Sequence, residues 1–122
     1  MVRSEDMSFL KGIKTSRYPK LVRDNVLYLI NASGKDYIAT AEKNPMVLTG
    51  WIAEKIKEEL KEYREASPEL KLEEAADMYE ACLALWSLQG LKIEEIIKKA
   101  EEKAKSKGKF RDGLILWDVI ER

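Results

Sequence analysis

The fold of this chain is decided by residues 54–77, which read EKIKEELKEYREASPELKLEEAAD. Apolar residues recur at intervals of three and four on both sides of the Ser-Pro-Glu sequence at 67–69. This pattern is typical of two amphipathic helices separated by a break. The first helix is expected to continue to about Ala66 and the second to about Leu88. Two such helices in succession predict a helical bundle.

The flanking sequence adds shorter elements. Asp24 and Asn44 are the expected N-caps of a first and a second helix, and Pro45 suits the first helical position. The predicted elements are helices at 24–30, 44–66, 67–88 and 93–107, with stops at Gly34, Gly90 and Gly108, and a short strand at 37–41. The expected fold is therefore all-α, with a short strand pair as its one β feature.

At 122 residues the chain has the length of a single domain. Residues 1–17 are polar and non-periodic and predict a flexible leader, so 18–122 is the expected folded domain. The apolar run at 114–117 is expected to dock on the bundle as an extended segment. Because chains this short often complete a site with a neighbouring copy, we expect an oligomer.

Composition excludes several classes of function. The formal net charge is zero, which argues against a general nucleic-acid binder. No apolar run is long enough to cross a bilayer, and no signal-peptide stretch is present, so we expect no membrane partner. A single cysteine, Cys82, favours a reducing cytoplasm. Histidine is absent, which excludes Ser-His-Asp and Cys-His catalysis and His-ligated zinc.

Two short motifs place carboxylates on the long predicted helices. Glu59 and Glu62 lie three residues apart on the first helix, hence one turn apart on one face. Glu74 and Asp77 have the same spacing on the second helix. The apolar residues on the same faces are Leu48, Ile52 and Tyr63 on the first helix, and Leu70, Ala81, Ala84 and Leu88 on the second. The four carboxylates are therefore expected to point into the bundle.

Burying several ionised carboxylates together is costly unless a cation compensates them. Oxygen ligands from facing helices suit a hard divalent cation, Mg²⁺ or alternatively Mn²⁺. Di-iron bundles use a histidine that this chain lacks. The other interpretation is a solvated acidic face, with Lys61 and Lys71 as neighbouring partners. The repetition on two successive apolar faces favours a metal site.

The pattern EExxE at 58–62, followed by ExxD at 74–77, resembles the signature of the MazG-like all-α nucleotide pyrophosphohydrolase superfamily. This superfamily includes the phosphoribosyl-ATP pyrophosphohydrolases. The opening YPKLVRD at 18–24 and the closing KGKF at 107–110 are similar to motifs of one phosphoribosyl-ATP-pyrophosphohydrolase-like branch. The resemblance covers about residues 18–116, nearly the whole chain.

The resemblance implies a helical oligomer, a dimer or a tetramer, with a Mg²⁺ site. The implied ligands are Glu59, Glu62, Glu74 and Asp77, with Glu58 beside them in a supporting role. Two positions depart from the branch. Leu27 replaces its usual proline after Arg-Asp, and Gly113 stands where an arginine usually follows the closing motif, although Arg111 is close enough to substitute.

The predicted reaction splits a nucleoside triphosphate between its α and β phosphates, giving a monophosphate and pyrophosphate. Metal ions can neutralise the polyphosphate and activate water for this reaction without a covalent nucleophile. Glu58 or Glu62 could accept the proton of the water, and the sequence leaves that choice open. Phosphate contacts beyond the metal call for Lys and Arg. The candidates are Lys20, Arg23, Lys103, Lys107, Lys109 and Arg111, each of which could equally serve in a salt bridge or an exposed helix end.

Two other functions stay open. Phosphoribosyl-ATP hydrolysis uses the same reaction centre and differs only in what the pocket accepts. A non-catalytic helical oligomerisation module would keep the acidic residues but show no Mg²⁺-dependent turnover. The base and sugar of the nucleotide and the number of metal ions do not follow from the sequence.

Overall fold

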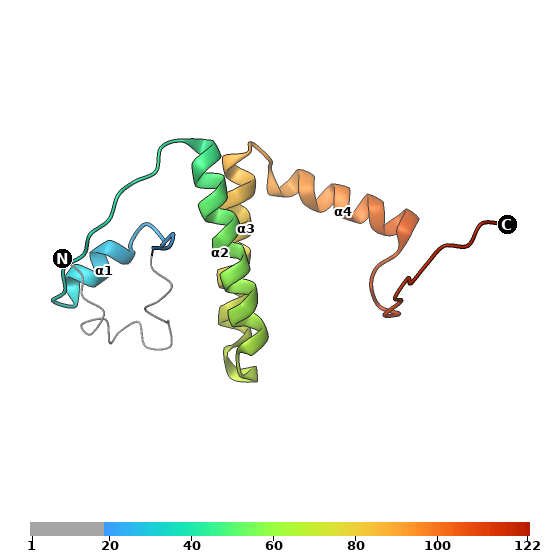
Figure 1. Cartoon of the computed structure of the whole chain (residues 1–122), viewed down its shortest axis with the longest axis horizontal. Coiled ribbons are helices and arrows are strands. Elements are labelled where there is room, and N and C mark those ends of the chain that lie inside the picture. The colour runs from blue at the N-terminus through green and yellow to red at the C-terminus, as the bar shows by residue number, and fades with distance from the viewer. Residues whose placement is uncertain (1–18) are drawn as a thin grey trace.

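The structure is a computed structural model that describes residues 19–122, and the predicted leader at 1–17 lies outside this range. Within the described range the chain is all-helical, as expected (Figure 1). Its elements are α1 (Val26–Ala32), α2 (Pro45–Glu65), the short 3₁₀ helix η4 (Pro68–Leu70), α3 (Lys71–Leu88) and α4 (Ile93–Lys107). None of these helices is both long and apolar enough to span a membrane.

Two local expectations are wrong. The segment 37–41 is not a strand but part of the connection between α1 and α2. A strand needs a partner, and no backbone hydrogen bond joins 37–41 to another segment of the described chain. Asp24 is not the N-cap of α1, because the chain first makes a turn in which Val26 N donates to the Arg23 carbonyl at 3.1 Å. Asn25 takes the cap position instead.

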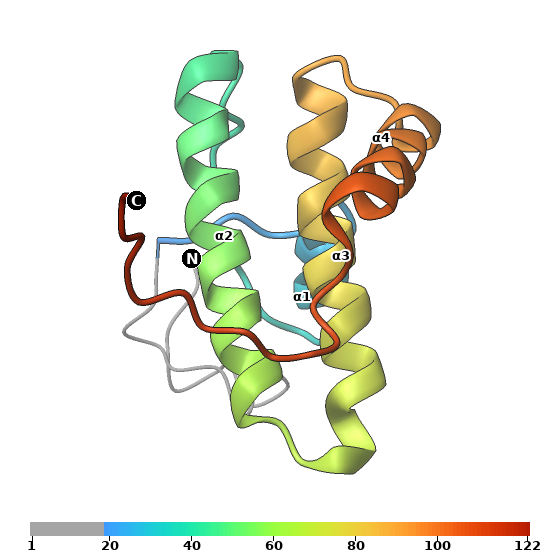
Figure 2. The same ribbon diagram turned by 90° about the vertical axis from the view of Figure 1, so that its right-hand side faces the viewer.

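The helices α2 and α3 lie side by side as an antiparallel hairpin (Figure 2). Asn44 caps α2 as expected, since its Oδ1 accepts a hydrogen bond from Met46 N at 2.9 Å, and Pro45 occupies the first turn. At the far end the Lys71 ammonium donates to the Tyr63 carbonyl and lies 4.6 Å from the centre of the Tyr63 ring. This contact adds a side-chain donor to a carbonyl near the C-terminus of α2, which also accepts a hydrogen bond from Ala66 N at 3.4 Å, and it helps to fix the turn into α3.

The interior of this hairpin is small. Ile52 on α2 and Ala81 on α3 are buried, and Ile30 on α1 is the third buried apolar residue of the described range. All other large apolar side chains there keep some exposure to solvent. The expected bundle is therefore reduced, within one chain, to a two-helix hairpin with loosely associated flanking segments.

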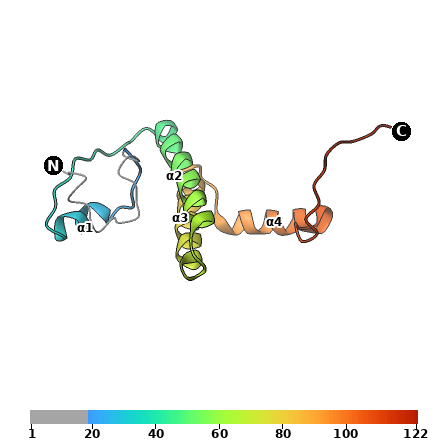
Figure 3. The ribbon, with the colours of Figure 1, turned by 60° about the horizontal axis from the view of Figure 1, so that its bottom comes forward.

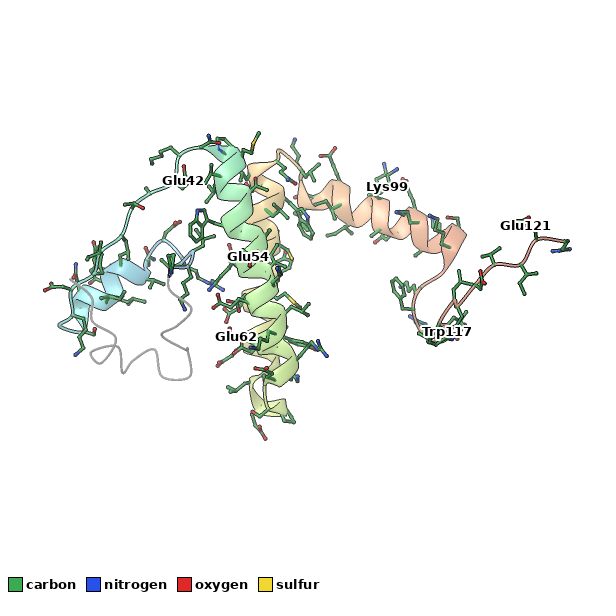
Figure 4. The ribbon with its side chains drawn as sticks, viewed as in Figure 1. Glu42, Glu54, Glu62, Lys99, Trp117 and Glu121 are labelled. Carbon is green, nitrogen blue, oxygen red and sulfur yellow. The ribbon has the colours of Figure 1, made fainter. Side chains whose placement is uncertain are left out.

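The last helix, α4, leaves the hairpin after the turn at Gly90, whose φ of 77° favours glycine. It begins and ends where the sequence predicted, but it projects away from α2 and α3 (Figures 1 and 3). The expectation that the apolar run 114–117 docks on the bundle is wrong for the single chain, since Leu114 and Trp117 are 86% and 89% exposed. The reason is that α4 carries this tail away from the hairpin, as the position of Trp117 in Figure 4 shows.

Candidate metal centre

Facing turns of α2 and α3 bring the predicted carboxylates together. One oxygen each from Glu59, Glu74 and Asp77 lie within 4.8 Å of one another, and the same holds for Glu58, Glu59 and Glu62. Glu59 belongs to both groups and is therefore the residue that joins the two helices at this site. Figure 4 shows Glu62 near the C-terminal end of α2, on the side toward α1 in that view.

Burial is concentrated on Glu59, which is 4% exposed and is the most deeply buried charged residue of the described range. Its Oε2 atom and Oε2 of Glu74 are both buried without a hydrogen-bond partner. An unsatisfied buried acceptor costs about 1–3 kcal/mol. Glu58, Glu62, Glu74 and Asp77 are half-buried around it. The prediction that the carboxylates point into the bundle thus holds for Glu59, whereas the Asp77 side chain stays 44% exposed.

The close packing of the carboxylates changes the pKa values of Glu59 and Glu74. Burial raises the pKa of the Glu59 carboxyl above its ordinary value, the charges of Glu62 and Asp77 raise it further, and Lys55 partly offsets them. Burial also raises the pKa of Glu74, again with contributions from Glu62 and Asp77. Two carboxylates of the cluster are therefore poorly compensated and would gain from an added positive charge.

Three basic side chains border the cluster. The Lys55 ammonium lies 3.1 Å from Glu59 Oε1 and 3.6 Å from Glu58 Oε1. Lys20 Nζ lies 3.8 Å from the same Glu58 oxygen. Arg23 Nη2 lies 2.7 Å from Asp77 Oδ1. The N-terminal segment that contains Lys20 and Arg23 is thereby held against the acidic side of the hairpin.

The residues fit a hard divalent cation. Every group in the cluster offers carboxylate oxygen, which Mg²⁺ and Mn²⁺ prefer, and the two unpartnered oxygens lie on facing helices. No family model, no curated protein and no solved structure matches this chain. The candidate site is therefore defined by this donor set and its burial.

The predicted phosphate-binding residues fall into two sets. Lys20 and Arg23 lie at the cluster, where they form the salt bridges that were the alternative interpretation of each. Lys103, Lys107, Lys109 and Arg111 lie on the last turns of α4 and in the loop after it. Because α4 points away from the hairpin, the structure does not bring these four to the carboxylates of the same chain (Figure 1). Contact of these four residues with phosphate therefore stays a prediction.

Sequence reasoning missed Lys55. A lysine four residues before a glutamate usually forms an exposed helix pair, and nothing in the composition separates Lys55 from its neighbours Lys57 and Lys61. The helical spacing could have identified it. Lys55 precedes Glu59 by four residues, about one turn, so both residues lie on the face that carries the carboxylates.

Proposed function

We propose that this chain is a Mg²⁺-dependent nucleotide pyrophosphohydrolase, which hydrolyses a cytoplasmic NTP or dNTP to a monophosphate and pyrophosphate. The observation that carries this proposal is the convergence of Glu59, Glu74 and Asp77 from two helices, with two buried oxygens left unpartnered. The resemblance of the EExxE and ExxD motifs to the MazG-like superfamily supports the reaction class.

Of the two acidic groups, the one shared by α2 and α3 is the better place for the ion. The Glu58, Glu59 and Glu62 group already has the Lys55 ammonium against two of its members. By contrast, the Glu59, Glu74 and Asp77 group contains both unpartnered oxygens. A divalent cation there would compensate the charges that raise the pKa values of Glu59 and Glu74. Glu62, whose charge acts on both residues, would complete the ligand set.

When bound, Mg²⁺ would neutralise phosphate oxygens and make a bound water more acidic. The chain's own residues would do the rest. Glu58 and Glu62 lie on either side of Glu59 along α2 and are the two candidates to accept the proton of the attacking water. Arg23, at the solvent side of Asp77, is placed to exchange this carboxylate for a phosphate oxygen as the nucleotide enters.

Exposed apolar surface supports a homo-oligomer, a dimer or a tetramer, as the form in which the chain acts. Leu72 and Tyr79 on α3, Ile97 on α4 and Trp117 in the tail all remain at least half exposed in one chain. Patches of this kind usually mark association surfaces. Association would also allow the basic end of α4 to approach the carboxylates of a neighbouring copy.

The test is a substrate panel of NTPs, dNTPs and phosphoribosyl-ATP with Mg²⁺, with pyrophosphate and orthophosphate measured separately. Pyrophosphate release that disappears in Glu59→Gln and Asp77→Asn, but survives in the exposed control Glu54→Gln, supports the proposal. Turnover of phosphoribosyl-ATP alone would favour the biosynthetic alternative. Folded, metal-binding protein with no turnover of any nucleotide would favour the non-catalytic module.

A further inference from the structure

Lys55 has a position that no other cation of the described chain shares. Its ammonium lies between two carboxylates, 3.1 Å from Glu59 Oε1 and 3.6 Å from Glu58 Oε1. The Lys55 side chain is 19% exposed, so this contact is largely withdrawn from water. Lys20 and Arg23 contact Glu58 and Asp77 instead, which leaves Lys55 as the cation on the buried carboxylate.

We propose that the Lys55 ammonium is a displaceable internal counter-ion of this site. In the metal-free protein it compensates the buried charge of Glu59, and it leaves Glu59 for Glu58 when a divalent cation binds. Lys55 is then a positioning residue that competes with the metal and sets its affinity. This inference rests on the metal site of the proposed function.

Competition follows from electrostatics. A divalent cation ligated by Glu59 and the Lys55 ammonium would lie a few ångströms apart in a partly buried site, where like charges repel strongly because water screens them poorly. Each cation therefore weakens the interaction of the other with the Glu59 carboxylate. Binding of the metal includes the work of moving Lys55.

A second carboxylate, that of Glu58, is within reach of the Lys55 ammonium when it leaves Glu59. Glu58 Oε1 is already within 3.6 Å of its ammonium. Lysine has a flexible four-carbon stem and a compact charge, so a small rotation keeps the Glu58 pair while releasing Glu59. Glu58 lies outside the group formed by Glu59, Glu74 and Asp77, and it can hold Lys55 without giving up a ligand of that group.

The experiment titrates the full chain with Mn²⁺ alone, without nucleotide, and follows free Mn²⁺ by electron paramagnetic resonance. Lys55→Met is expected to bind Mn²⁺ about tenfold more tightly than the wild type, which corresponds to about 1.4 kcal/mol. Lys55→Arg, which keeps the charge, is expected to bind no more tightly than the wild type. The matched control is Lys57→Met on the same helix, because Lys57 is 73% exposed and pairs with Glu54 rather than with the cluster.

Equal or weaker Mn²⁺ binding by Lys55→Met overturns the proposal, as does equal tightening in Lys57→Met. A variant that is unfolded without metal is titrated in the same way by circular dichroism. Refolding by Mn²⁺ then supports the role of counter-ion, and failure to refold contradicts it. If the wild type does not bind Mn²⁺ at all, both the metal site and this inference fail. If Mn²⁺ binds and tightens as expected but no nucleotide is cleaved, only the proposed function fails.

Discussion

Arg23 Nη2 donates to Asp77 Oδ1 at 2.7 Å, across 54 positions of sequence. This bond ties the segment before α1 to the middle of α3, at the edge of the acidic cluster. Both side chains are about half exposed, at 55% and 44%. Because exposed ion pairs contribute only about 0–1 kcal/mol to stability, the pair is better explained by its place beside the candidate ligands than by its effect on folding.

Replacing Arg23 is expected to lower activity while leaving the stability of the fold nearly unchanged. Arg23→Ala should change the free energy of unfolding by less than about 1 kcal/mol. It should reduce kcat/KM for the nucleotide by about 10- to 100-fold, because a charged hydrogen bond to phosphate contributes about 1.5–3 kcal/mol. Urea denaturation and steady-state kinetics measure the two quantities. Arg64→Ala, at the exposed end of α2, is the control. An unchanged kcat/KM in Arg23→Ala would show that the Asp77 pair is purely structural.

Glu59→Gln is expected to abolish metal binding without unfolding the protein. The amide keeps the shape of the side chain and removes a charge that burial disfavours. The metal-free melting temperature should therefore stay the same or rise, whereas Mn²⁺ affinity should fall by more than the roughly 100-fold that loss of an outer-shell partner can cost. Thermal melts of the metal-free protein test the first statement and Mn²⁺ titration tests the second, with Glu54→Gln as the exposed control. A large loss of metal-free stability would mean that the ionised Glu59 stabilises the fold.

Stability of the metal-free protein should depend on pH through Glu59 and Glu74. Their pKa values in the folded chain are raised above the ordinary 4.5, so the folded state holds these protons at pH values where the unfolded chain has lost them. Their contribution is therefore least favourable above the raised pKa values, and it improves as the pH falls through them toward 4.5. Saturating Mg²⁺, which favours the ionised forms, should reverse this trend.

The measurement is the urea midpoint as a function of pH, with and without Mg²⁺. Subtracting the same curve for Glu59→Gln isolates the contribution of Glu59. A difference curve that is flat between neutral pH and 4.5 would argue that the Glu59 carboxyl is as well solvated as in the unfolded chain.

Substitution of Trp117 tests whether the chain forms the proposed homo-oligomer. In one chain it is 89% exposed, so in an oligomer it is a candidate for burial against a neighbouring copy. Trp117→Glu is expected to lower the molar mass measured by light scattering, because a buried charge without a partner opposes association. Lys98→Glu on the exposed face of α4 should leave the mass unchanged. A wild-type protein that is monomeric at all concentrations would remove the assembly from the proposal.

The parts that sequence predicted well depend on local signals. Asn44 followed by Pro45 fixes the start of α2, and the Ser-Pro step at 67–68 ends it, because capping and proline geometry act within a few residues. The three-residue spacing of Glu59 and Glu62 likewise decides which face they share. These features need no knowledge of the rest of the chain.

The parts that sequence did not predict depend on distant partners. Arg23 and Asp77 could not be paired, because nothing local indicates a contact between residues so far apart. The direction of α4 could not be predicted either. Its amphipathic pattern indicates that one face must be covered, but the pattern does not identify the surface that covers it. The extended run at 37–41 shows the same limit, because β propensity acts only when a second segment is available.

Within residues 19–122, Ile30, Ile52 and Ala81 are a very small core. Ordering a backbone costs roughly 1–2 kcal/mol per residue, and three buried side chains cannot offset that sum. If neighbouring copies cover the remaining apolar surface, folding and association are one equilibrium, and dilution alone should act as a denaturant. The concentration of the chain would then decide how much of it is structured, before any metal or nucleotide is added.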